Sequence, residues 1–275
     1  MVEYPDSTDL HTGSASHNYS LDRKAIPMAQ VQNLVQVMEE QGFPVSLQLK
    51  GTGITAAQLG NSDTRITYRQ RIKQLENMLF LRHEPGFWLK SPREVSISEF
   101  GLLGYAMMSS ATLEQAIHIA VKYHRMAGAL FDLTFSVEGE EASLKIEHLM
   151  PVGEVAHYVV EDLFIGLGPL VNLLLGREYL PSAVRFNYSI PDASLEERLS
   201  TREIRDRYQV AFRSVVEFDS PWCEYRFDAK LLGEPLAAAD TNTARICEES
   251  CRQLLDQMEI QDDFISKICH LLLAS

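Results

Sequence analysis

A change in hydrophobic period at Gly128 limits the folds open to this chain. Before Gly128, apolar residues over 113–124 recur every three to four positions, as on one face of a helix. After it, apolar and polar residues alternate over 131–137 and again over 143–148, with Gly139 between the two runs. Alternation with a period of two places every second side chain on one face of a strand. The pattern therefore predicts a β-hairpin with one buried face.

The remaining segments mix helical and extended patterns without a regular strand–helix–strand repeat. Helical spacing covers residues 28–38, 68–79, 98–127, 155–175 and 194–208, and extended patterns cover 184–190, 210–218 and 224–227. Within 98–127 we expect two helices in close succession, the second capped by Ser110 or Thr112. Because this order does not fit a doubly wound parallel fold, it predicts an α+β fold with a largely antiparallel sheet flanked by helices.

Charge and composition exclude several classes of protein. The chain has 25 Lys and Arg against 38 Asp and Glu, a net charge of −13, so we expect it to repel nucleic-acid phosphates. Its longest apolar stretch, 163–175, is too short to cross a bilayer. Residues 1–24 are polar and aperiodic; they lack the apolar core of a secretory signal and predict a disordered tail. With four cysteines expected to be reduced, we predict a cytoplasmic protein without a membrane partner.

The segment 240–275 is expected to form C-terminal helices for dimerisation and linkage. A seam of small and apolar residues spaced 3, 4, 3 and 4 positions apart consists of Ala244, Cys247, Cys251, Leu254 and Met258. Such a narrow seam is typical of a helix that pairs with a second helix. Two interpretations stay open: packing on its own domain, and dimerisation about a twofold axis. A separate final helix is predicted over 260–274.

Motifs of catalysis and metal binding are missing or weak. The chain has no Gly-x-Ser-x-Gly, no phosphate-binding loop and no His-Glu-x-x-His. Gly166, Gly168 and Pro169 lie in a helical pattern and favour a kink or a close helix–sheet contact over a dinucleotide loop. Cys247 and Cys251 with Cys269 and His270 make a poor zinc set, because no Cys-x-x-Cys is present. We therefore expect no catalytic residue, no metal and no cofactor.

Histidines and aromatic residues favour a ligand pocket instead. His124 lies on an apolar helix stripe, His148 on the buried face of its predicted strand, and His157 one turn before Glu161. Each histidine has an alternative interpretation as a core residue with one hydrogen bond. Together they are the polar groups expected in a mostly apolar binding site. The predicted ligand-binding residues are Tyr105, His124, Phe135, His148, His157, Phe164, Phe186 and Trp222.

Three strings resemble a known family. Residues 100–106, Phe-Gly-Leu-Leu-Gly-Tyr-Ala, followed by Ser109, Ser110 and Leu113, resemble the N-terminal, arabinose-binding-like sensor domain of AraC/XylS-type transcriptional regulators. Residues 51–54 and 227–236 are similar to an early and a late motif of that domain. The resemblance spans about 28–275 and implies a sensor followed by two helix-turn-helix motifs that read DNA. It thereby predicts a basic DNA-binding domain beyond residue 275. It implies no ligand residue by position.

These observations predict three parts: a disordered tail (1–24), a ligand-sensing domain (25–239), and dimerisation and linker helices (240–275). The predicted function is the effector-binding part of a homodimeric bacterial regulator that touches DNA only through the domain beyond this chain. The expected effector is a small molecule such as an amphipathic carboxylic acid, and an amino acid stays open.

Three alternative functions remain. One is a hydrolase that uses His157 with Glu161 as an oriented base. Another is a haem or gas sensor with His124, His148 or His157 as axial ligand. The last is an interaction module with a filled core.

Overall fold

The computed structural model describes residues 20–61, 63–82, 87–90, 95–190 and 200–273. Its α-helices are α1 (Met28–Glu40), α2 (Val45–Gln48), α3 (Ala56–Leu59), α4 (Tyr68–Arg82), α5 (Leu102–Met108), α6 (Leu113–Tyr123), α7 (Ala156–Leu175), α8 (Thr201–Phe212) and α9 (Thr241–Leu273). Short 3-10 turns are η1 (Phe87–Lys90), η2 (Ile97–Phe100), η3 (His124–Ala127), η4 (Gly153–Val155) and η5 (Ala229–Gly233). Most of the predicted tail, residues 1–19, lies outside the described residues.

A five-stranded sheet with the order β3-β4-β7-β5-β6 forms the centre of the fold. Its strands are β3 (Phe131–Glu138), β4 (Glu141–Leu149), β5 (Ala183–Arg185), β6 (Val215–Glu217) and β7 (Cys223–Asp228). All neighbours pair antiparallel except β5 and β6, which pair parallel. The predicted α+β class with a largely antiparallel sheet is therefore confirmed.

Strands β3 and β4 form the hairpin that the alternating pattern predicts. Gly139 occupies the turn with φ +65°, a conformation that glycine adopts without a steric penalty. Leu133 pairs with Ile146, but the next pair toward the open end is Asp132 with His148. This register shift is a bulge, which bends the strand and changes the pairing of the residues beyond it.

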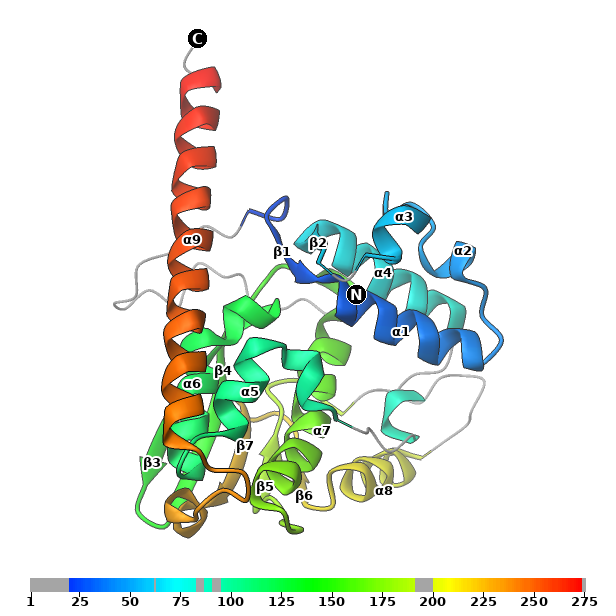
Figure 1. The fold of residues 1–275 in the computed structure, drawn as a ribbon. Coiled ribbons are helices and arrows are strands. Elements are labelled where there is room, and N and C mark those ends of the chain that lie inside the picture. Colours follow the sequence, from blue (N-terminus) through cyan, green and yellow to red (C-terminus); the bar gives the residue numbers. More distant parts are fainter. Residues whose placement is uncertain (1–19, 62, 83–86, 91–94, 191–199, 274–275) are drawn as a thin grey trace.

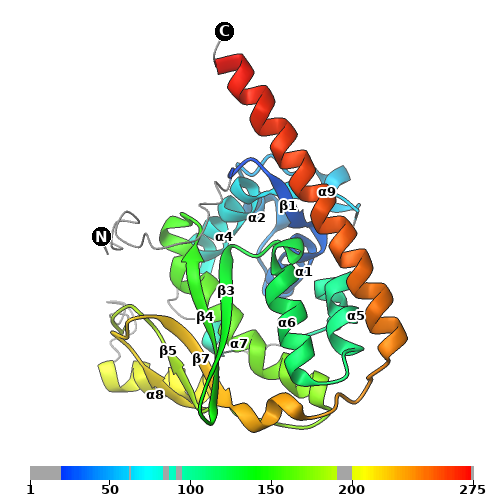
Figure 2. The same cartoon turned by 90° about the vertical axis from the view of Figure 1, so that its left-hand side faces the viewer.

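Helices α6 and α7 cover the inner face of the sheet (Figure 2). The side chain of Thr112 caps α6 by accepting a hydrogen bond from the backbone N–H of Gln115, as predicted. Pro169 lies inside α7 and removes one backbone donor from the helix. Helix α8 packs beside α7 and β6. The largest hydrophobic cluster of the described residues lies between these helices and the sheet.

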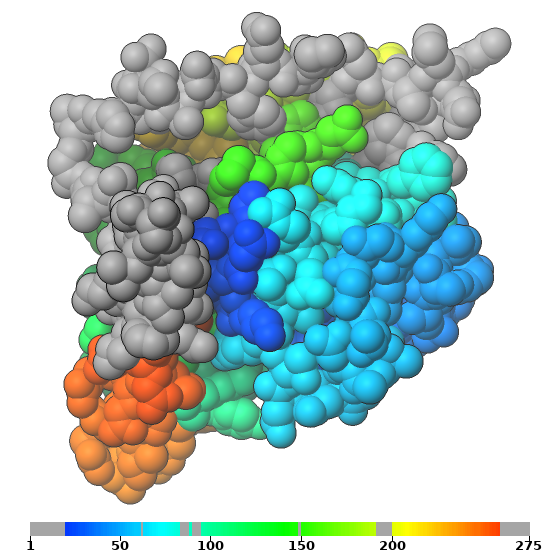
Figure 3. Space-filling view, turned by 90° about the horizontal axis from the view of Figure 1, so that it is seen from above, coloured from blue at the N-terminus to red at the C-terminus, as the bar shows by residue number. Residues whose placement is uncertain are grey.

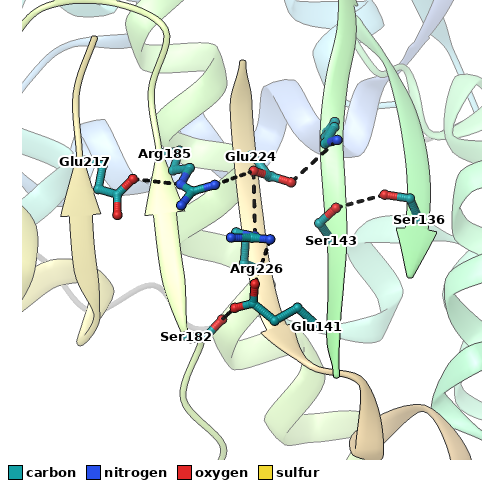
Figure 4. Close-up of polar contacts among 9 residues, drawn as sticks. Ser136, Glu141, Ser143, Ser182, Arg185, Glu217, Glu224 and Arg226 are labelled. Carbon is teal, nitrogen blue, oxygen red and sulfur yellow. Dashed lines mark hydrogen bonds and ion pairs between the residues drawn. The ribbon is translucent and has the colours of Figure 1, made fainter. Parts of the chain in front are cut away.

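The outer face of the sheet carries a ladder of charged and hydroxyl side chains instead (Figure 4). Arg185 on β5 contacts Glu217 on β6 at 2.7 Å and Glu224 on β7 at 3.3 Å. On the same face, Arg226 on β7 contacts Glu141 on β4 at 2.6 Å. Because the side chain of Glu224 is buried, its negative charge needs a nearby cation such as Arg185. The ladder links four neighbouring strands and distinguishes this polar face from the apolar inner face.

An N-terminal lobe formed by α1–α4 packs on a second hydrophobic cluster. A two-stranded sheet of β1 (Lys24–Pro27) and β2 (Arg65–Thr67) joins these helices, and the cluster lies between the lobe and the segment 150–159 that leads into α7. From above, the lobe, coloured blue to cyan, forms one continuous surface (Figure 3). The prediction of helices over 28–38 and 68–79 is confirmed by α1 and α4.

Two extended predictions are wrong in extent. The strand expected over 184–190 ends at Arg185, because its regular pairing with β6 and β7 covers only Ala183–Arg185. The strand expected from Val210 begins at Val215, because α8 continues to Phe212. The beginning of the helix expected over 194–208 lies outside the described residues, and α8 starts at Thr201.

The C-terminal segment forms one continuous helix, not two. Helix α9 extends from Thr241 to Leu273, packs along α5 and α6, and then projects beyond the body of the protein (Figure 1). Neither glycine nor proline occurs between the two predicted helices to end the first. The prediction of a separate helix over 260–274 is therefore wrong.

One helix among the described residues is long and apolar enough to span a membrane by length and composition alone: Gly153–Leu175. It includes the helical turns before residue 163, so it is longer than the apolar stretch 163–175. Of its most apolar window, 44% is buried inside the protein. Its packing against α6, α8 and the sheet is that of the core helix of a folded domain.

Candidate functional site

A cavity of about 60 Å³ lies between the inner face of the sheet and the helices that cover it. Its walls come from α5, α6, α7, β3, β4 and β7. The lining residues are Met107, Leu113, Ala116, Ile117, Ala120, Val121, Leu133, Leu144, Leu167, Leu170, Val171, Leu174, Tyr179, Tyr225 and Phe227. Since none of these side chains is charged, the cavity is an apolar site inside the fold.

Two alanines contribute to the space in this cavity. Ala116 and Ala120 lie one turn apart on α6, so their methyl groups point to the same side of the helix. Most other lining positions of α6 and α7 carry Leu, Ile or Val. A small side chain among larger ones leaves unfilled volume that neighbouring residues cannot recover without strain.

Two tyrosines form part of the wall. The hydroxyl of Tyr179 donates a hydrogen bond of 2.6 Å to the hydroxyl of Tyr225, and both rings are buried. Burial raises the pKa of both hydroxyls well above the usual value for tyrosine, so both remain neutral. Gly168 of α7 lies against this pair, where an added Cβ would be 3.7 Å from the Tyr225 oxygen. This part of the wall is uncharged and closely packed.

A buried carboxyl group forms the second notable arrangement. Glu161 of α7 is fully buried, and one of its oxygens accepts hydrogen bonds of 2.7 Å from both Tyr188 and Tyr208. The other oxygen accepts a hydrogen bond of 2.7 Å from the indole N–H of Trp88. These donors come from η1, from the segment after β5, and from α8. Glu161 therefore ties three separate parts of the chain to α7.

Burial determines the electrostatics of this carboxyl group. It raises the pKa of Glu161 from 4.5 to about 7, while the hydrogen bonds from Tyr208, Tyr188 and Trp88 oppose the rise. Burial also lowers the pKa of His157, whose ring stacks on Tyr188 with centroids 4.0 Å apart. A histidine with a lowered pKa is neutral at pH 7.

The structure brings three predicted ligand residues into one aromatic cluster. Phe164 and Phe186 are buried with ring centroids 6.0 Å apart. Phe186 stacks on Tyr188, which in turn stacks on His157. None of the three lines the cavity described above. They pack around Glu161 and its tyrosine partners instead.

The other predicted ligand residues are spread over the fold. Tyr105 and Trp222 are 48% and 44% exposed. His124 contacts the carbonyl oxygen of Val121 at 2.6 Å and the carboxylate of Asp132 at 3.3 Å. Phe135 packs edge-to-face with His118. His148 lies on β4, and its side chain is outside the described part of the structure.

The predicted dimerisation seam is divided between two environments. Cys251 is fully buried, and Cys247 and Met258 pack against the same core as α5 and α6. Leu254 is 39% exposed, and Ala244 is half-buried. The part of the seam that carries the cysteines thus packs on its own domain, as in the first of the two interpretations. Leu254 lies on the side of α9 that is exposed.

The hydrolase alternative finds no geometric support in the described contacts. Both oxygens of Glu161 already accept hydrogen bonds from Trp88 and the two tyrosines, an arrangement that suits an anchoring residue better than an oriented base. Among the residues whose placement is described, no group of three His, Cys, Asp or Glu side chains is arranged to hold a metal ion.

Sequence reasoning missed the partners of Glu161 and most of the cavity wall. Trp88 is 73 positions from Glu161, and no local pattern signals such a pairing. The alanines were visible as small residues on the apolar stripe of the predicted helix. Their effect on packing depends on the strands opposite them, which the stripe does not specify.

Comparison with known proteins identifies consistent similarities. A family model described as the N-terminal arabinose-binding domain of AraC transcription regulators matches residues 42–236. The chain is 26% identical to the ornithine utilization regulator of Pseudomonas aeruginosa, over 90% of this chain and 70% of that protein. It is 23% identical to an uncharacterized HTH-type transcriptional regulator of Mycobacterium tuberculosis, over 85% of this chain and 66% of that protein.

A solved structure is more distantly similar. The crystal structure of the transcriptional regulator CdpR from Pseudomonas aeruginosa has 16% sequence identity and a TM-score of 0.42. The match covers 63% of this chain and 59% of that chain.

Proposed function

Because the chain belongs to the AraC family of transcription regulators and contains its arabinose-binding domain, we propose that it senses a small molecule and signals through α9. The observation that carries this proposal is the apolar cavity between α6, α7 and the sheet, inside the region that the family model matches. Concave, mostly apolar pockets are the usual sites for small ligands.

The contacts of the cavity wall provide a route from ligand to α9. Met107 of α5 and Val121 of α6 line the cavity, and both helices also pack on α9. The backbone N–H of Asp240, just before α9, donates a 2.9 Å hydrogen bond to the carbonyl of Ser109 after α5. Lys122 at the end of α6 contacts Glu248 of α9 at 3.3 Å. A ligand that moves α5 and α6 therefore changes the surface on which α9 rests.

The magnitude required for such a switch is modest. A ligand shifts an equilibrium between two arrangements only by the difference of its affinities for them. A coupling of about 1–3 kcal/mol is typical of regulated proteins. Repacking around one or two buried side chains supplies free energy of this size.

The effector we propose is a small molecule with an apolar part that enters the cavity. An amphipathic carboxylic acid fits if its carboxylate stays outside, because burying an unpaired charge in apolar surroundings is costly. An amino acid would have to leave two charged groups outside. The apolar lining of the cavity therefore favours an amphipathic carboxylic acid over an amino acid.

Dimerisation is assigned to the open face of α9. Ile246 and Leu254, eight residues apart, are 50% and 39% exposed, and residues at this spacing share a helix face. Two copies of α9 that pair through this face form a symmetric contact. The similar mycobacterial protein is named an HTH-type regulator, so DNA contact is assigned to a helix-turn-helix domain of the regulator that lies outside residues 42–236.

The experiment is a ligand screen in which the bound site is located. Fatty acids, aromatic acids and amino acids are tested for a saturable rise of the melting temperature of the 275-residue chain, as binding to the folded state requires. Methyl NMR then locates each hit. The proposal expects shifts of Leu133, Leu144 and Leu170. Hits that perturb only the N-terminal lobe, for example Ile72 and Leu75, would contradict it.

A further inference from the structure

We infer that the cavity accepts an uncharged hydrocarbon group of about four to five carbon atoms, and that Ala116 and Ala120 determine the size of that group. This inference rests on the proposed function, since it names the part of the effector that the sensing site holds. The lining residues come from six elements of the fold and from the segment after α7, and together they surround one space.

The chemistry of the wall sets the class of the bound group. Thirteen of the lining residues are aliphatic, Met or Phe, and the other two are Tyr179 and Tyr225. The hydroxyls of these tyrosines hydrogen-bond to each other at 2.6 Å. A polar ligand atom in the cavity would lose its bonds to water and gain no charged partner there. A hydrocarbon has no hydrogen bonds to water to lose, and each methylene group that it buries strengthens binding about fourfold.

The dimensions of the cavity set the size of the group. One water needs about 10–15 Å³ of such space, whereas this cavity offers about 60 Å³. Apolar cavities of this kind remain dry and bind small apolar molecules. We therefore expect a hydrocarbon group to enter the cavity without displacing ordered water. A group of about eight carbons is too large for the cavity.

Ala116 and Ala120 limit the space from the α6 side. Their methyl groups are one helical turn apart on the cavity face of α6. A leucine at either position adds three carbon atoms in the direction of the cavity. Such a residue fills the space that the ligand needs, and it also buries new apolar surface in the folded protein.

Cyclopentane, tetrahydrofuran and cyclooctane test the ligand class directly. Cyclopentane and tetrahydrofuran have five-membered rings of similar size, but tetrahydrofuran replaces one methylene by an ether oxygen. Binding to the 275-residue chain is followed by methyl NMR at Leu133, Leu144 and Leu170. We expect saturable binding of cyclopentane, at least tenfold weaker binding of tetrahydrofuran, and no binding of cyclooctane.

Substitutions on α6 test the role of the alanines. Ala120→Leu should abolish cyclopentane binding and leave the melting temperature equal to or above that of the unmodified chain. Ala120→Val is a smaller change and should weaken cyclopentane binding by an intermediate factor. It provides the test if the leucine variant does not fold. Glu114→Leu adds the same side chain at an exposed position of the same helix and should leave the affinity unchanged.

The outcomes separate this inference from the proposed function. Tetrahydrofuran binding as tightly as cyclopentane would overturn the hydrocarbon assignment, and cyclooctane binding would overturn the size limit. Unchanged affinity in Ala120→Leu would remove the alanines from the site. If no probe shifts the cavity methyls, the inference fails even when the effector screen finds a ligand elsewhere. If cyclopentane binds but no effector class does, the inference holds and the proposed function fails.

Discussion

Replacing Glu161 by glutamine should remove most of the pH dependence of stability between pH 5 and pH 8. Glu161 is fully buried and accepts hydrogen bonds from Tyr188, Tyr208 and Trp88. Glutamine has nearly the same shape but does not ionise in this range. The substitution therefore removes a titrating group while it keeps the packing of α7.

The magnitude follows from the pKa of Glu161, which burial raises from 4.5 to about 7. Because the pKa is higher in the folded chain than in the unfolded chain, the folded state holds the proton more tightly. The stabilisation is complete below pH 4.5 and is lost as the pH rises through about 7. The difference between the two pKa values corresponds to about 3 kcal/mol of unfolding free energy.

Glutamine also introduces a cost that does not depend on pH. Its carbonyl oxygen can replace the oxygen that faces the two tyrosines, but its amide group then faces the indole N–H of Trp88. Two donors that face each other in a buried site cost about 1–3 kcal/mol. The variant is therefore less stable than the unmodified chain at pH 5, and the difference shrinks or reverses at pH 8.

Urea unfolding of both proteins at pH 5 and pH 8 measures this prediction. The lowered pKa of His157 adds a pH dependence of opposite sign, but both proteins share it, so the difference between them isolates Glu161. Fluorescence of Trp88 in a Trp222→Phe background should titrate near pH 7 and lose this transition in the glutamine variant. Parallel stability profiles for the two proteins would refute the assignment of Glu161 as the titrating group.

Other predictions concern packing, hydrogen bonding and assembly. Phe186→Ala should lower the unfolding free energy by about 3–5 kcal/mol, because the ring is fully buried among aromatic neighbours; a loss below 1 kcal/mol in chemical denaturation would contradict this. Tyr208→Phe should cost about 1–2 kcal/mol through the lost bond to Glu161, and an unchanged urea midpoint would argue against that bond. Leu254→Asp with Ile246→Asp should give monomers in sedimentation at an unchanged melting temperature; an unchanged mass would exclude this face of α9.

The hairpin and the main helices could be predicted because their patterns are local. Alternation over 131–137 and 143–148 located β3 and β4, but the predicted buried face is incomplete. Leu144 and Ile146 of β4 are buried, whereas no residue of β3 is fully buried and Val137 is 47% exposed. The end of β5 could not be predicted, because it depends on how far the distant strands β6 and β7 pair with it, and the local alternation does not specify that. The extent of α8 was also missed, since Val210 is 76% exposed and its apolar character does not indicate burial in a strand.

The candidate site depends on contacts between distant residues and was therefore only partly predictable. The apolar stripe of α6 predicted a buried face, but not that Ala116 and Ala120 would leave space beneath the sheet. The seam on α9 predicted a helix with an apolar face. The pattern does not specify what covers that face, and Cys251 packs on its own domain while Leu254 is exposed. Ligand binding by the predicted histidines stays a prediction.

Amide hydrogen exchange with and without a cavity ligand tests most directly whether this chain couples an internal binding site to α9. Cyclopentane at saturation provides a defined ligand, and Ala120→Leu provides the matched control. We predict altered exchange in α5, in α6 and in residues 241–258 of α9 for the unmodified chain, and no change for the variant. Altered exchange confined to the cavity wall, with α9 unaffected, would contradict it.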